Sequence, residues 1–168
     1  MNNPTTLPGT DQDTPFGRAI AFVWHEAELL DSKNYTDWGQ LWAEDGHYVV
    51  PIDPDTTDFA STLNYAYDDA RMRQLRIERF TSGFSMSAAD SAITVRTVSR
   101  FTLVETMGDE IEVRSAQLLA AYKRGATTLF AANLTHRIRL TDNGPKLVLK
   151  VVRLVNSQDA LNALGFLL

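Results

Sequence analysis

A long β-rich segment, residues 93–156, constrains the fold of this chain more than any other feature. Its apolar and β-branched residues are typical of strands, and turn-forming sequences interrupt it at three places. These turns are Met107-Gly108-Asp109, Lys123-Arg124-Gly125 and Asp142-Asn143-Gly144-Pro145. Because turns this short join neighbouring antiparallel strands, the segment predicts a four-stranded antiparallel meander.

Within this segment, residues 130–140 alternate most regularly between apolar and polar side chains. One face takes Phe130, Ala132, Leu134, His136, Ile138 and Leu140, and the other takes Asn133, Thr135, Arg137 and Arg139. Successive side chains of a strand point to opposite faces, so one face of the sheet is expected to be covered and the other wetter. His136 is then a lone histidine on the covered face.

The first half of the chain favours helices. Thr14 suits a helix N-cap and Pro15 the first helical position, and a stripe with helical spacing follows: Phe16, Ile20, Val23, Ala27 and Leu30. A short second helix is predicted for residues 35–42, because Trp38, Leu41 and Trp42 are spaced i, i+3 and i+4. The two helices should form a hairpin. A third helix is predicted for residues 64–80, which lack Gly and Pro.

Residues 47–51 predict a strand that stops at Pro51, with a loop to about residue 58. Helices followed by long antiparallel strands belong to the α+β class. We expect N-terminal helices packed in the concave face of a strongly curved mixed or antiparallel sheet. By analogy, this order fits the cystatin-like cone of nuclear transport factor 2 and ketosteroid isomerase. Residues 1–13 are expected to be a disordered tail, and residues 14–168 one domain.

Composition removes several classes of function. The chain has no cysteine, which excludes disulfides, thiolate-bound zinc and Cys-ligated iron–sulfur clusters within it. A net charge of -5 argues against a nucleic-acid partner. No apolar run is long enough to cross a membrane and the N-terminus does not resemble a signal peptide, so we expect a cytoplasmic protein. The glycine-rich nucleotide-binding motifs and the common hydrolase motifs are also missing.

The candidate catalytic residue is His136. The other two histidines, His25 and His47, give no metal-ligand spacing with it, so no metal site is predicted, and His25 should face solvent or a partner. A histidine on an apolar face is most often a hydrogen-bonded core residue, which is the interpretation we favour. The alternative is a cavity acid or base, with Asp31, Tyr35 and Tyr48 as its companions.

Four arginines form the densest basic cluster of the chain: Arg71, Arg73, Arg76 and Arg79. Since the chain is acidic overall and has no aromatic signature of RNA binding, a nucleic-acid site is disfavoured. Arginine is enriched in protein interfaces, so the cluster predicts a subunit contact.

Three stretches resemble the small, or β, subunits of aromatic-ring-hydroxylating dioxygenases, and they span most of the chain in the right order. The first combines residues 25–31, His-Glu-Ala-Glu-Leu-Leu-Asp, with Tyr35, Trp38 and the strand to Pro51. The second is the arginine-rich segment 71–79. The third runs from Ser99-Arg100-Phe101 through Val113-Arg114-Ser115 and Tyr122-Lys123-Arg124-Gly125 to Phe130-Ala131-Ala132. The chain departs from the family at Asn133-Leu134-Thr135 and at Lys150, which stands where the family has an arginine.

The resemblance implies a structural subunit without catalytic, cofactor or metal residues of its own, in a system that cis-dihydroxylates an aromatic compound. It implies a large α subunit as partner, in an α3β3 assembly in which the small subunit also associates as a trimer. The large subunit would carry a Rieske 2Fe-2S cluster and a mononuclear Fe(II). An NAD(P)H-dependent reductase would supply it with electrons. The alternatives are a free-standing dehydratase or isomerase of the scytalone dehydratase or ketosteroid isomerase type and, less favoured, a binding module.

Overall fold

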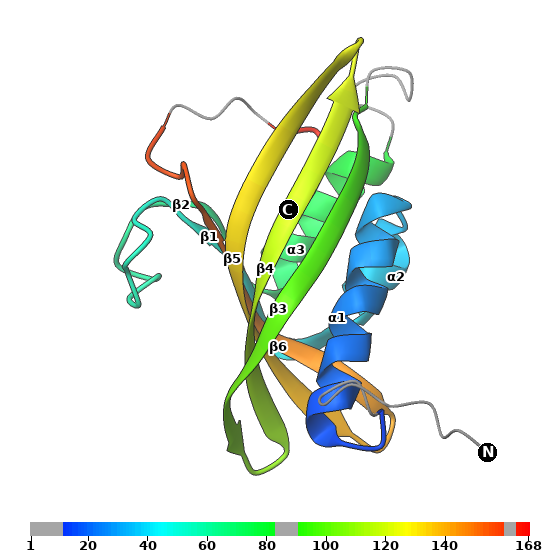
Figure 1. Cartoon of the computed structure of the whole chain (residues 1–168), viewed down its shortest axis with the longest axis vertical. Coiled ribbons are helices and arrows are strands. Elements are labelled where there is room, and N and C mark those ends of the chain that lie inside the picture. Colours follow the sequence, from blue (N-terminus) through cyan, green and yellow to red (C-terminus); the bar gives the residue numbers. More distant parts are fainter. Residues whose placement is uncertain (1–11, 83–90, 160–163) are drawn as a thin grey trace, which may run out of the picture.

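The computed structural model describes residues 12–82, 91–159 and 164–168. In these ranges the chain forms three helices and six strands, shown in Figure 1. The elements are α1 (Pro15–Asp31), α2 (Tyr35–Gln40), β1 (Trp42–Pro51), β2 (Asn64–Asp68), α3 (Ala70–Thr81), β3 (Ile93–Met107), β4 (Glu110–Lys123), β5 (Ala126–Thr141) and β6 (Gly144–Leu154). The expected tail falls almost entirely outside the described residues.

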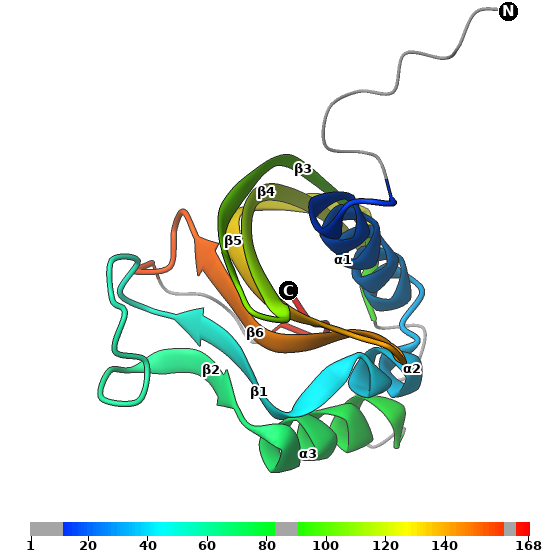
Figure 2. The same cartoon turned by 90° about the horizontal axis from the view of Figure 1, so that it is seen from below.

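The six strands form one sheet in the order β2-β1-β6-β5-β4-β3. The predicted meander β3 to β6 is confirmed, with every consecutive pair antiparallel, whereas β1 pairs with β6 in parallel. The sheet is therefore mixed. It curls around an interior, and α1 lies across the open side of the curl (Figure 2). This arrangement confirms the expected α+β class with a strongly curved sheet.

Helix α1 begins as the sequence predicts. The hydroxyl of Thr14 accepts a hydrogen bond from the amide of Gly17 at 3.0 Å, which satisfies one of the free N–H groups of the first turn. The predicted stripe is buried from Ile20 to Leu30 and packs on β3 and β4, while His25 is exposed as expected. Helix α1 thus closes the concave face of the sheet.

Three predicted boundaries are wrong: the end of the second helix, the start of the first strand, which was expected at residue 47, and the start of the third helix. The second helix ends at Gln40, and Trp42 already begins β1, where it packs edge to face on Trp38 at 5.4 Å between ring centroids. Residues 64–68 form strand β2 rather than the start of the third helix, because they alternate towards and away from the core and pair with β1. Asp69 then caps α3, accepting from the amide of Met72 at 2.8 Å.

The last residues of the chain fill the inside of the curled sheet. Phe166, Leu167 and Leu168 are buried, and the C-terminus lies inside the curl in Figure 2. Arg96 of β3 donates to the carbonyl of Leu167 at 3.0 Å, and the amide of Leu168 donates to the hydroxyl of Tyr48 at 3.2 Å. The interior is therefore occupied by the chain itself at this point.

Candidate functional site

Four side chains from four different elements meet inside the sheet, and we call them the inner cluster: Glu26 of α1, Trp38 of α2, His136 of β5 and Lys150 of β6. Glu26 is at its centre. Its Oε1 accepts from Lys150 Nζ at 2.9 Å and from Trp38 Nε1 at 3.0 Å, and its Oε2 lies 3.1 Å from His136 Nε2. All four side chains are almost completely buried. Both carboxylate oxygens of Glu26 are thus occupied.

Local structure explains why these residues converge. His136 and Lys150 are direct partners across β5 and β6, and Tyr48 of β1 is the partner of Lys150, so the three share one row on the inner face. Glu26 is three residues after Val23 and four before Leu30, on the buried face of α1. Helix α1 therefore places a carboxylate opposite this row of the sheet.

The electrostatics of the inner cluster follow from burial and pairing. Burial alone would raise the pKa of Glu26, but Lys150, His136 and Trp38 outweigh it and hold that pKa well below its usual value. Burial lowers the pKa of His136 despite its bond to Glu26, and burial lowers the pKa of Lys150 against the attraction of Glu26. Glu26 is then a carboxylate, and neutral His136 donates to it through Nε2.

Of the companions proposed for His136, Asp31 and Tyr35 lie elsewhere, whereas Tyr48 shares its row of the sheet. Asp31 accepts from Arg96 Nε at 2.8 Å and from the hydroxyl of Thr94 at 2.9 Å. Tyr35 packs on Phe80, and burial raises the pKa of its hydroxyl. Tyr48 belongs to the same row as Lys150 and bonds to the terminal residue. The structure gives His136 a different companion, Glu26.

The four arginines of the predicted interface are divided between two environments. Arg73 is buried, stacks over Trp42 at 4.3 Å and donates to the carbonyls of Ala43 and Gly46. Arg76 is paired with Asp68 in a bidentate contact, whose second bond is 2.9 Å long. Arg71 and Arg79 are exposed on the outer side of α3. Two of the four therefore stabilise this chain internally, and the interface role stays a prediction.

Sequence reasoning missed Glu26 and Lys150 as partners of His136. One signal was available: Glu26 occupies the apolar stripe of the first helix, just as His136 occupies the apolar face of its strand. Two polar groups on two faces expected to be covered have to be satisfied by each other. Lys150 gave no comparable signal, since its strand alternates less regularly.

No group of three or more His, Cys, Asp or Glu side chains within the described ranges is arranged to hold a metal ion. No helix within these ranges is long and apolar enough to cross a membrane.

The sequence profile of the ring hydroxylating β subunits matches residues 25–159. The small oxygenase component of the p-cumate 2,3-dioxygenase system of Pseudomonas putida is 30% identical over 130 residues, 76% of this chain and 72% of that protein. A benzene 1,2-dioxygenase β subunit of Pseudomonas putida is 32% identical over 104 residues, 56% of each chain.

Solved structures agree on the fold. The β subunit of benzoate 1,2-dioxygenase from Burkholderia mallei superposes with a TM-score of 0.74 at 20% identity, covering 89% of this chain and 95% of that one. An NTF2-like protein with a cystatin-like fold from Novosphingobium aromaticivorans gives a TM-score of 0.55 at 16% identity, covering 83% and 80%. The predicted cone is confirmed, and the chain belongs to the family of β subunits of aromatic-ring-hydroxylating dioxygenases.

Proposed function

We propose that this chain is the structural, non-catalytic β subunit of a multicomponent dioxygenase that cis-dihydroxylates an aromatic compound in aromatic catabolism. The observation that carries the proposal is the inner cluster. His136 is 0% exposed, and Glu26 is already bonded to three neighbours, so neither group is available to a substrate. An acid or base in a cone-fold enzyme has to face an open cavity instead.

The outer face of the sheet supports a role in assembly. Five large apolar side chains of β3, β4 and β5 are between 49% and 70% exposed there: Ile93, Val95, Leu118, Tyr122 and Leu129. Register brings them together, because Ile93 pairs with Tyr122, while Val95 and Leu129 both pair with Ala120. A contiguous exposed apolar patch is typical of a surface that another protein covers.

The partner in this proposal is the large α subunit, in an α3β3 assembly. That subunit would hold the Rieske 2Fe-2S cluster and the mononuclear Fe(II), and an NAD(P)H-dependent reductase would supply electrons. Arg71 and Arg79 of α3 remain candidates for a subunit contact, since they flank the exposed Met72 and Leu75. We assign the complex to the cytoplasm, where NAD(P)H is available.

Replacing His136 with Gln distinguishes a structural role of this residue from a role as a catalytic acid or base. The variant should assemble with the large subunit and keep wild-type turnover per assembled complex, because Gln can still donate to Glu26. A catalytic acid or base would instead lower turnover by about 10²- to 10⁴-fold. Turnover is measured as substrate-dependent oxygen uptake with the large subunit and reductase added, and assembly by gel filtration.

The matched control is His47→Gln, because His47 lies on β1 of the same sheet and is partly exposed. An assembled His136→Gln complex with the catalytic loss, beside a normal control, would contradict the proposal. Dehydration or isomerisation of a small substrate by the isolated wild-type chain would replace it with the alternative of a free-standing enzyme.

A further inference from the structure

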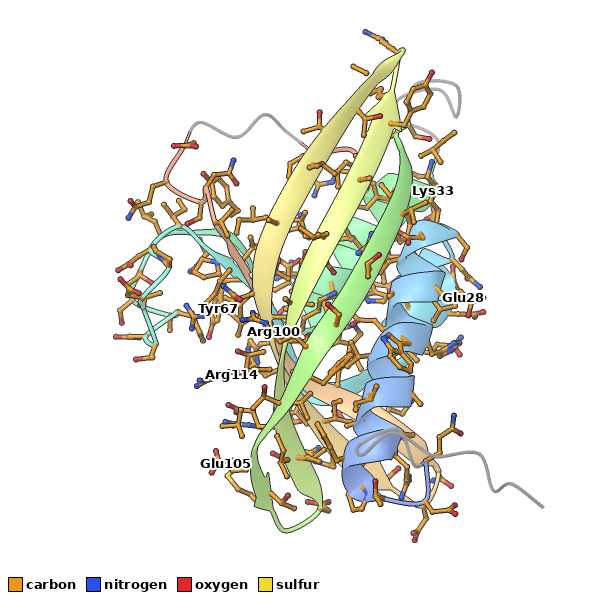
Figure 3. The ribbon with its side chains drawn as sticks, in the orientation of Figure 1. Glu28, Lys33, Tyr67, Arg100, Glu105 and Arg114 are labelled. Carbon is orange, nitrogen blue, oxygen red and sulfur yellow. The ribbon has the colours of Figure 1, made fainter. Side chains whose placement is uncertain are left out.

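A pocket on the outer face of the sheet collects three arginines from three strands. It has a volume of about 460 Å³, and its polar lining consists mainly of Arg100 of β3, Arg114 of β4, Arg153 of β6 and the side chains of Thr102, Asn133 and Thr135. Arg100 and Arg114 lie on the side of the strands away from α1 in Figure 3. We call these three arginines and the space between them the arginine pocket.

A bulge in β3 builds one wall of this pocket. Ser99 pairs with Ala116 and Thr102 with Arg114, so Arg100 and Phe101 together oppose the single residue Ser115. Arg100 takes the left-handed conformation, with φ 55°, which is unfavourable for a residue with a side chain. Phe101 packs edge to face against Trp24 of α1 at 5.8 Å. The bulge thus turns Arg100 outwards while Phe101 supports the helix.

Two of the three arginines of the pocket donate to neutral oxygen atoms. Arg100 donates to the amide oxygen of Asn133 at 2.7 Å, and Arg153 to the carbonyl of Pro54 at 2.9 Å. Within the described residues, no carboxylate forms an ion pair with any of the three arginines. Burial and the charge of Arg114 lower the pKa of Arg153, and this exceeds the opposite effect of the carboxylates of the 53–55 loop.

In neighbouring rows of the same face, arginines are paired with carboxylates on the adjacent strand. Arg137 pairs with Glu112 at 2.8 Å, and Arg139 pairs with Glu110 at 2.8 Å. In the pocket, the cross-strand neighbours of Arg114 are instead Thr102 and Thr135. In the described part of the chain, the outer face therefore pairs Arg137 and Arg139 with carboxylates but has no such pair for the arginines of the pocket.

We propose that the arginine pocket binds an oxyanion, a carboxylate or phosphate group, which no described residue of this chain supplies. A guanidinium binds such groups through two parallel hydrogen bonds, and three guanidinium groups around one concavity strengthen the attraction. The threonine hydroxyls offer further donors. The inference rests on this chain alone and does not require the proposed function.

The first test uses the isolated chain. Isothermal titration with inorganic phosphate and with malonate, at constant ionic strength in sodium chloride, should show saturable binding to wild type. Arg114→Gln should bind at least about tenfold more weakly, because a charge-assisted hydrogen bond to the anion is lost. Arg18→Gln, an exposed arginine on α1, should bind like wild type.

The second test asks whether the oxyanion is carried by a neighbouring subunit, and this arm alone rests on the proposed function. Arg114→Gln should then weaken binding to the large subunit at least about tenfold, and added salt should weaken the wild-type complex more than the variant complex. Binding of the free anions, or this loss in the complex, supports the site and identifies its source. Arg114→Gln matching wild type in both tests overturns it, and if no complex forms, the first test alone decides.

Discussion

The inner cluster and the arginine pocket lie on opposite faces of the same sheet, and they differ in how their charged groups are paired. Inside, Glu26 is bonded to Lys150, Trp38 and His136 within 3.1 Å. Outside, Arg114 has no carboxylate partner in the described part of the chain. Thr135, beside His136 in the sequence, lines the outer pocket. One residue of displacement along a strand is enough to change from one environment to the other.

The difference follows from solvation, because water can stabilise a charge on the outer face but not one inside the sheet. A buried charge has to be satisfied by protein groups, since leaving it unpaired costs several kcal/mol, whereas an exposed guanidinium is solvated. The contacts of the inner cluster are therefore needed for folding. The arginines of the outer pocket remain available to bind a ligand. Substitutions in the two regions should differ accordingly.

The largest effect is expected from Glu26→Gln. The variant keeps the shape of the side chain but removes the negative charge next to Lys150, leaving a buried ammonium without a counter-charge. We expect the free energy of unfolding to fall by about 3–5 kcal/mol, measured by urea denaturation of the isolated chain. Glu28→Gln is the matched control, because Glu28 is exposed on the same helix, on the side of α1 away from the sheet in Figure 3.

A double variant sharpens this result. Glu26→Gln combined with Lys150→Met removes both charges and should recover part of the loss, so the two substitutions will not be additive. Additive losses would mean that the charges of Glu26 and Lys150 are not coupled, contrary to the 2.9 Å contact between them.

An intermediate effect, dependent on pH, is expected from His136. Because the pKa of His136 is lowered in the folded chain, the unfolded chain binds more protons below about pH 6.5, so this contribution to stability is present above that pH and is lost as the pH falls. Between about pH 7.5 and about pH 5.5, wild type should lose more stability than His136→Gln, which cannot titrate. Urea midpoints at the two pH values measure the difference.

At about pH 7.5 itself, His136→Gln should cost only about 1 kcal/mol, because one buried hydrogen bond is altered rather than lost. The carboxyl of Glu26, whose pKa is also lowered, loses its contribution only at more acidic pH and is common to both proteins. Equal pH dependence of wild type and His136→Gln would show that His136 is not held neutral by burial.

The smallest effect is expected from Arg114→Gln. Since Arg114 is exposed and repels Arg153, its replacement should change the free energy of unfolding of the isolated chain by no more than about 0.5 kcal/mol. The same urea experiment measures it. A loss comparable to that of Glu26→Gln would place Arg114 among the residues needed for folding and remove the contrast between the two faces.

Local sequence patterns predicted the secondary structure correctly where a single pattern covered a segment. The cap at Thr14, the stripe of α1 and the alternation of residues 130–140 all predicted what the structure contains. They failed at Trp42 and at residues 64–68, where pairing with another strand outweighed helix propensity. The stretch 64–68 lacks Gly and Pro, but its edge position beside β1 is a tertiary property.

The sequence by itself determined the class of fold, the family and the conclusion that His136 lies on a covered face. Periodicity and turn composition act over a few residues, so they can be read without knowing what packs on them. The tertiary structure alone decided that Glu26, Lys150 and His136 meet, and that Arg100, Arg114 and Arg153 share one pocket. These contacts join residues 110 and 124 positions apart in the inner cluster, and the sheet that creates them depends on the order and register of all its strands.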